Sequence, residues 1–225
     1  CESMTASEDL TTWTMTLRSG ISFHDGTPLN SEAIQVNFEA QRGDPLVGLA
    51  VKPFYPAENA TTLIDDLTIS FNLSDPDAWF PTSLTGQLGY VGSPTWLTAA
   101  LEDPTLDQQP VGTGPFVFES RNEDSITRFV RNESWWNGSA YLDAVEFLPV
   151  TDPATRTSLL LEGELDGLAT TDVESILRMV DDGTIQNYLD DNGEESFALI
   201  NSAKAPFDDI RARQAITHAT PRENY

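Results

Sequence analysis

Hydrophobic and polar positions alternate along two stretches of the first half of the chain. Residues 12–18 and 67–73 place an apolar side chain at every second position, the period of a strand with one buried face. Between them, residues 31–40 carry apolar side chains at helical spacing, and Asn30 or Ser31 can cap the helix. The first half therefore predicts strands with one helix between them.

The second half of the chain alternates strand patterns with helix patterns. The predicted strands are 116–118, 126–130, 145–150 and 197–200, and the predicted helices begin at Asp152, Thr171 and Asp208. Asp152 is followed by proline, and Thr171 stands three residues before Glu174 as in a capping box. Strands that alternate with helices indicate an α/β layer in this half.

Two stretches carry little periodicity. Residues 43–62 contain several Gly and Pro residues and predict a loop with at most a short helix. Residues 84–109 are rich in Gly, Pro and Thr and support no firm assignment.

Charge excludes several classes of partner. The chain has 225 residues, with 12 Lys and Arg against 36 Asp and Glu, so its formal net charge is −24. A protein this acidic offers no basic surface for nucleic acid and is repelled by an anionic membrane. No apolar run approaches the roughly 18 residues that a membrane helix needs, and no signal peptide is visible. We expect neither nucleic-acid binding nor membrane insertion.

Motifs for catalysis, cofactors and metals are missing from the sequence. Cys1 is the single cysteine, which excludes an internal disulfide, and His24 and His218 do not stand at metal-ligand spacing. Residues 112–114 (GTG) lack the third glycine of a dinucleotide loop. Residues 190–193 (DDNG) suggest calcium but lack the first ligand of a calcium loop. We therefore predict no enzyme, no cofactor and no metal site.

Three segments follow one another in a recognisable order: residues 10–33 (LTTWTMTLRSGISFHDGTPLNSEA), 110–116 (PVGTGPF) and 206–216 (PFDDIRARQAI). Together they resemble the bacterial extracellular solute-binding proteins of family 5, the peptide, dipeptide and nickel group that serves ABC importers. Residues 131–136 (RNESWW) and 163–166 (GELD) are similar to two shorter family motifs. The resemblance departs from the family at Ala33-Ile34, where Asp-Val is usual.

The resemblance implies an α/β, class II periplasmic-binding-protein-like fold, bilobed with an extra small domain, of which this chain is an internal fragment. Residues 1–111 would form the small extra domain of the first lobe. Residues 112–203 would form part of main lobe I, and residues 204–225 the start of a truncated main lobe II. On this reading Cys1 is an ordinary residue rather than a lipidated anchor.

The resemblance also implies a function. The protein would capture a peptide or a similar small solute at the periplasmic or extracellular face of the cytoplasmic membrane and deliver it to an ABC permease. A carbohydrate-active hydrolase, and a binding protein with a chemosensing or chaperone role, are the alternatives. A peptide, a nickel chelate and a sugar all remain open as ligands.

The candidate ligand-binding residues lie in three segments that could face the cleft. They are Asp44, Leu46, Tyr90, Gly92, Ser93, Gly112, Thr113 and Gly114. The glycines of the third segment would allow a ligand to approach the backbone closely. The alternative interpretation of that segment is a tight structural crossing without a ligand.

Overall fold

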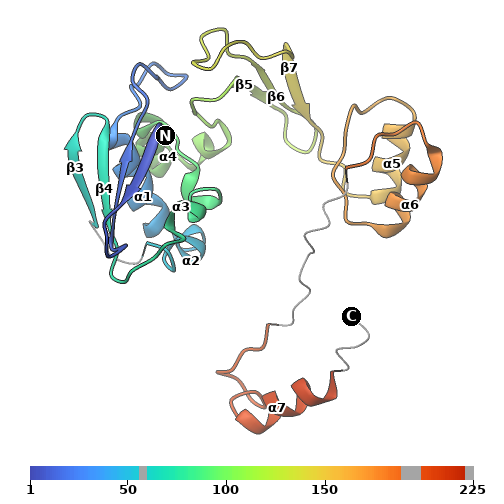
Figure 1. Cartoon of the computed structure of the whole chain (residues 1–225). Helices are drawn as coiled ribbons and strands as arrows, with labels where there is room; N and C mark the ends of the chain where they lie inside the picture. The colour runs from blue at the N-terminus through green and yellow to red at the C-terminus, as the bar shows by residue number, and fades with distance from the viewer. Residues whose placement is uncertain (56–59, 189–198, 221–225) are drawn as a thin grey trace. The chain divides into compact units, whose positions relative to one another are not determined.

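The computed structural model describes residues 1–55, 60–188 and 199–220 (Figure 1). The chain divides into two compact units, Cys1–Val150 and Thr151–Tyr225. The predicted domain boundaries after residues 111 and 203 stay predictions.

A four-stranded antiparallel sheet forms the first part of the larger unit. Its strands are β1 (Ser3–Ala6), β2 (Thr12–Thr16), β3 (Thr61–Asp65) and β4 (Thr68–Asn72), in the order β1-β2-β4-β3. The two predicted strands are β2 and β4, and they pair at the centre of the sheet with Met15 opposite Ile69. The edge strands β1 and β3 were not predicted, because they are mostly exposed and lack a regular apolar alternation.

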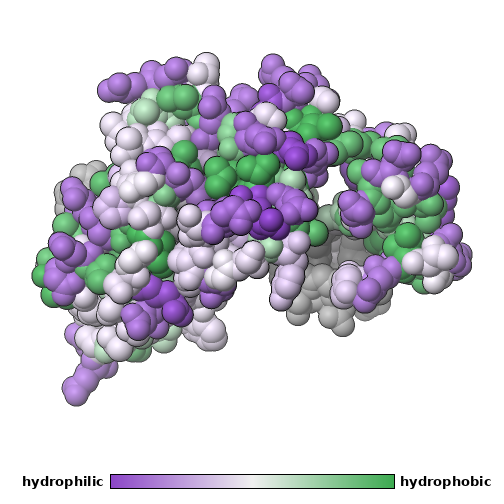
Figure 2. Space-filling view, turned by 90° about the horizontal axis from the view of Figure 1, so that it is seen from above, coloured by the Kyte–Doolittle hydropathy of each residue, from purple (hydrophilic) through white to green (hydrophobic). Residues whose placement is uncertain are grey.

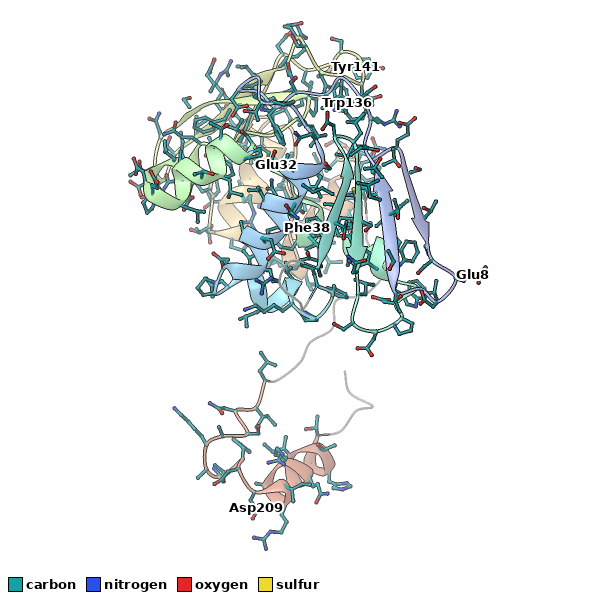
Figure 3. All side chains as sticks on the ribbon, turned by 90° about the vertical axis from the view of Figure 1, so that its left-hand side faces the viewer. Glu8, Glu32, Phe38, Trp136, Tyr141 and Asp209 are labelled. Atoms are coloured by element: carbon teal, nitrogen blue, oxygen red, sulfur yellow. The ribbon has the colours of Figure 1, made fainter. Side chains whose placement is uncertain are left out.

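Helix α1 (Ser31–Gly43) closes the core of this sheet. The Asn30 side chain accepts a hydrogen bond from the Ala33 amide at 2.9 Å, so the predicted cap is confirmed. Phe38 lies between α1 and the strands, as Figure 3 shows, and its ring centroid is 4.9 Å from that of Phe71. Both side chains are almost completely buried, and with Tyr55 they form the centre of the core.

Short helices lie in the two stretches with little periodicity. They are α2 (Val47–Val51) in the first, and α4 (Pro94–Glu102) with the 3-10 helices η1 (Gln87–Gly89) and η2 (Pro104–Gln108) in the second. Helix α3 (Phe80–Ser83) precedes the second stretch. The Gly and Pro residues of these stretches interrupt the apolar pattern on which a sequence prediction of a helix depends.

A second antiparallel sheet completes the larger unit. It contains β5 (Phe116–Arg121), β6 (Thr127–Arg131) and β7 (Ala144–Phe147), in the order β5-β6-β7. The predicted hairpin is confirmed, while the strand predicted over 145–150 ends at Phe147. Arg128 on the central strand joins Glu119 on β5 to Glu146 on β7.

The smaller unit contains three helices among its described residues: α5 (Pro153–Leu161), α6 (Val173–Asp182) and α7 (Ile210–Ala219). The predicted Asp152 cap of α5 is confirmed, with its carboxylate 2.8 Å from the Thr155 amide. Of the strand predicted over 197–200, residues 197 and 198 lie outside the described part, and the other two have no regular structure. No helix in the described ranges is both long and apolar enough to span a bilayer.

Two predicted helix caps were wrong by one residue. Asp172, not Thr171, caps α6, since its carboxylate accepts from the Ser175 amide at 2.8 Å. Asp209, not Asp208, caps α7 by accepting from the Arg211 amide at 2.8 Å. The Asp208 amide already donates to the Lys204 carbonyl, so Asp208 belongs to the turn that precedes α7.

Candidate functional site

A groove of about 1220 Å³ lies within the larger unit. Its wall is built from α1, from the segment 84–92, from α4 and from the segment 110–114. Most of the wall is apolar, including core residues such as Leu17 and Phe38. Figure 2 shows that apolar side chains also gather in patches among the hydrophilic ones on the protein surface. A groove of this size and composition suits a small organic ligand.

The structure brings six of the eight predicted site residues into the wall of this one groove. They are Asp44, Tyr90, Gly92, Gly112, Thr113 and Gly114. The two others lie outside the wall: Leu46 is 79% exposed, and Ser93 is completely buried. That the six touch a ligand stays a prediction.

Ser93 holds two parts of the protein together. Its hydroxyl donates to the Asp25 carboxylate and accepts from the Trp96 amide at 3.4 Å, which caps α4. Burial alone would raise the pKa of Asp25, but hydrogen bonds from Ser93 and Thr27 outweigh it and lower that pKa below its usual range. The Ser93 side chain thus faces protein rather than the groove, which accounts for its place outside the wall.

Asp44 shapes the loop between α1 and α2. Its Oδ1 atom accepts from the Leu46 amide at 2.7 Å and from the Val47 amide at 2.8 Å. These bonds satisfy amides at the start of α2, where helix donors lack partners. The carboxylate thereby stays at the groove wall.

Two side chains of α1 position the 90–92 segment. Asn37 is 3% exposed, donates to the Gly92 carbonyl and accepts from the Gly92 amide, both at 2.8 Å. Gln41 donates to the Tyr90 carbonyl at 2.5 Å. Sequence reasoning missed both residues, although they stand four positions apart on the face of α1 that also carries Phe38.

His24 positions the 112–114 segment, a role that the sequence did not reveal. Its backbone amide donates to the Gly112 carbonyl at 2.9 Å, and its Nε2 atom is 3.0 Å from the Gly114 carbonyl. Because a carbonyl only accepts, Nε2 carries the proton, and Nδ1 accepts from the Gly112 amide at 3.4 Å. Asn132 also donates to the Gly114 carbonyl, at 3.1 Å.

Gly112 and Gly114 leave unfilled space beside the backbone. Neither has the left-handed φ that favours glycine. A Cβ atom added at Gly114 would meet no described atom within 4 Å, and one at Gly112 would meet its nearest neighbours at 4.0 Å. By contrast, a Cβ atom at Gly92 would lie 2.8 Å from the Trp96 ring. Packing among the described residues therefore requires glycine at position 92 but not at 112 or 114.

Metal binding finds no geometric support in the described residues. Across 1–55, 60–188 and 199–220, no three His, Cys, Asp or Glu side chains gather as they would around an ion. The sequence DDNG at 190–193 lies outside these ranges.

Comparison with known proteins identifies one family over the whole chain. Residues 1–225 match the model described as "Bacterial extracellular solute-binding proteins, family 5 Middle". The chain is 30% identical to heme-binding protein A of Haemophilus influenzae over 242 aligned positions, covering 99% of the chain and 44% of that protein. It is 28% identical to the glutathione-binding protein GsiB of Shigella flexneri, covering 98% of the chain and 43% of that protein.

Solved structures share the fold. HbpA2 from Haemophilus parasuis superposes with a TM-score of 0.72 and 27% identity, over 99% of the chain and 48% of that structure. Haemophilus influenzae OppA, in complex with the peptide RPPGFSPFR, gives a TM-score of 0.73 at 21% identity, over 98% of the chain and 47% of that structure. The predicted class II periplasmic-binding-protein fold is confirmed, and the chain spans less than half the length of these relatives.

Proposed function

The chain belongs to the bacterial extracellular solute-binding proteins of family 5, and on that premise we propose that the complete protein captures a peptide or a similar small solute. Capture takes place on the outer side of the cytoplasmic membrane, and the solute passes to an ABC permease. Members of this family are periplasmic binding proteins rather than enzymes. Ligand, permease partner and location are proposals for the whole protein, of which the chain is a part.

One observation supports the groove as the place where the solute binds. The groove collects six residues from three separate segments that the sequence had singled out, namely the end of α1, residues 90–92 and residues 112–114. Its two open glycines leave room beside the backbone. We propose that the solute lies against this wall.

A carbohydrate-active hydrolase would require catalytic groups that a binding protein does not need. Catalysis would need carboxylates that act on a bound substrate and would release products. A binding protein returns its ligand unchanged. The similar proteins reported above are binding proteins by name, which favours capture.

The test uses the complete protein that contains this chain. Isothermal titration with short peptides, glutathione and heme should give saturable binding of at least one of them, and mass spectrometry should recover it intact. Product formation would favour the hydrolase, and a protein that binds nothing in this panel would contradict the proposed function. Co-purification with a permease would separate transport from a chemosensing or chaperone role.

Tryptophan fluorescence locates the binding event. Trp96 lines the groove, whereas Trp136 lies outside its wall, and Figure 3 labels it beside Tyr141. Trp96→Phe should remove the fluorescence change that a ligand causes, and Trp136→Phe should retain it. The reverse pattern would place the ligand elsewhere.

A further inference from the structure

Helix α6 exposes an apolar side that is typical of a helix packed against a core. Val173, Leu177 and Val180 stand at positions i, i+4 and i+7, so their side chains form one stripe along the helix, the α6 stripe. Their exposed fractions are 67%, 58% and 47%. The buried positions of α6 are Ser175 and Met179 instead. The described part of the chain therefore buries a serine of this helix and leaves its aliphatic stripe largely uncovered.

The α6 stripe continues into a hollow of the smaller unit. Helix α6 packs against α5 (Figure 1), and the two helices border a hollow of about 1060 Å³ to which Ile176, Met179 and Leu160 contribute. Ile176 stands three positions after Val173 and four before Val180, so it joins the stripe to the hollow. Stripe and hollow are therefore neighbouring parts of one surface with room to receive side chains from another element.

The complete protein contains a large part that can supply the missing cover. The chain spans 44% and 43% of the two curated relatives compared above, so a protein of similar length has more than half of its residues outside 1–225. An interface that forms and separates is about as polar as the rest of a protein surface, whereas a permanent one is more apolar. A continuous aliphatic stripe fits a permanent interface better than it fits a solute or a permease, which bind and leave again.

We propose that the α6 stripe is an internal interface of the complete protein, covered by an apolar helix or strand from outside residues 1–225. Exposed Glu174 and Asp181 stand three positions before and four positions after Leu177 and mark the edge of the stripe, so the covering element should turn polar there. The inference goes beyond the proposed function, because the α6 stripe lies in the smaller unit and the candidate groove in the larger one.

Photo-cross-linking in the complete protein identifies the cover. A photo-reactive phenylalanine analogue takes the place of Leu177, and the protein is irradiated at a dilution that keeps it monomeric. Mass spectrometry should then find a cross-link to a peptide of the same polypeptide from outside residues 1–225. The matched control places the analogue at Arg178, an exposed neighbour whose guanidinium donates to Ser158 of α5 at 3.3 Å. This control should not give the same cross-link.

Thiol labelling measures the cover without a bulky analogue. Leu177→Cys should react at least about tenfold more slowly than Arg178→Cys in the complete protein, because a covered thiol reacts only when the structure opens locally. Peptide mass spectrometry reads each position separately, so the exposed thiol of Cys1 does not interfere.

The outcomes are independent of ligand binding. A cross-link to a peptide within residues 1–225, a cross-link between two copies, or equal labelling rates of the two cysteines would overturn the internal interface while solute capture stands. A protein that binds no peptide, glutathione or heme would overturn the proposed function and leave the interface untouched. If the analogue at Leu177 prevents folding, the labelling rates decide.

Discussion

Replacing Gly114 by alanine should separate ligand binding from stability. The added methyl group meets no described atom within 4 Å, and the backbone is not left-handed. Alanine also has fewer unfolded conformations than glycine. Gly114→Ala should therefore raise the free energy of unfolding by about 0.4–1 kcal/mol, or leave it unchanged.

The same methyl group should lower the affinity for the ligand. If the solute approaches the backbone at Gly114, the methyl group occupies space that the solute needs. Overfilling a packed contact costs about 1–3 kcal/mol. That range corresponds to a loss of affinity of roughly fivefold to 150-fold.

The assay pairs urea unfolding with calorimetric titration of the complete protein. Gly89→Ala is the matched control, because its Cβ atom would lie 1.8 Å from the Leu84 carbonyl oxygen and should destabilise the fold. A clear loss of stability in Gly114→Ala would mean that the segment is the tight structural crossing. Unchanged stability with unchanged affinity would remove Gly114 from the ligand seat.

Three further predictions follow from the fold. Asp209→Ala should lower the urea midpoint more than Asp208→Ala, because only Asp209 caps α7, and equal effects would contradict the assigned cap. Phe71→Ala should cost about 3–5 kcal/mol in urea unfolding, since Phe71 is fully buried; a loss below about 1 kcal/mol would contradict the packing described. The folded state lowers the pKa of Asp25, so the stabilising bond with Ser93 is complete above the ordinary aspartate pKa and is lost as pH falls through the lowered value. Asp25→Asn should thus be less stable than the parent at neutral pH, and the difference in the free energy of unfolding should shrink as the pH falls below the ordinary aspartate pKa. A difference that does not change with pH would contradict the lowered pKa of Asp25.

The sequence predicted the strands whose apolar residues stand at every second position. In β2 and β4 these residues include Met15, Ile69 and Phe71, which belong to the core that also contains Ile34 and Phe38 of α1. Strands β1 and β3 stand at the sheet edges, where four or five mostly exposed residues leave no such period. Each pairs with the strand that follows it in the sequence, β1 with β2 and β3 with β4, so the partner's pattern and the short turn between them are the signals that locate it.

The two misplaced helix caps show that a capping pattern does not distinguish between adjacent residues. Asp208 and Asp209 are adjacent and chemically identical, and Thr171 and Asp172 both offer an oxygen acceptor. Either member of each pair satisfies the capping pattern. The choice depends on the preceding turn, such as the Lys204 carbonyl that engages the Asp208 amide.

In the candidate site, too, the sequence identified segments but not the individual residues that line the groove. The 90–93 and 112–114 segments were each predicted as a unit, and the structure divides only the first of them. Gly92 lines the groove, whereas Ser93 is buried, with its hydroxyl bonded to Asp25. His24 was missed because its partners lie about 90 positions further along the chain, and only the folded backbone brings them together. A motif thus identifies which segment forms the wall, whereas the hydrogen bonds of its neighbours decide which side chains are left to meet a ligand.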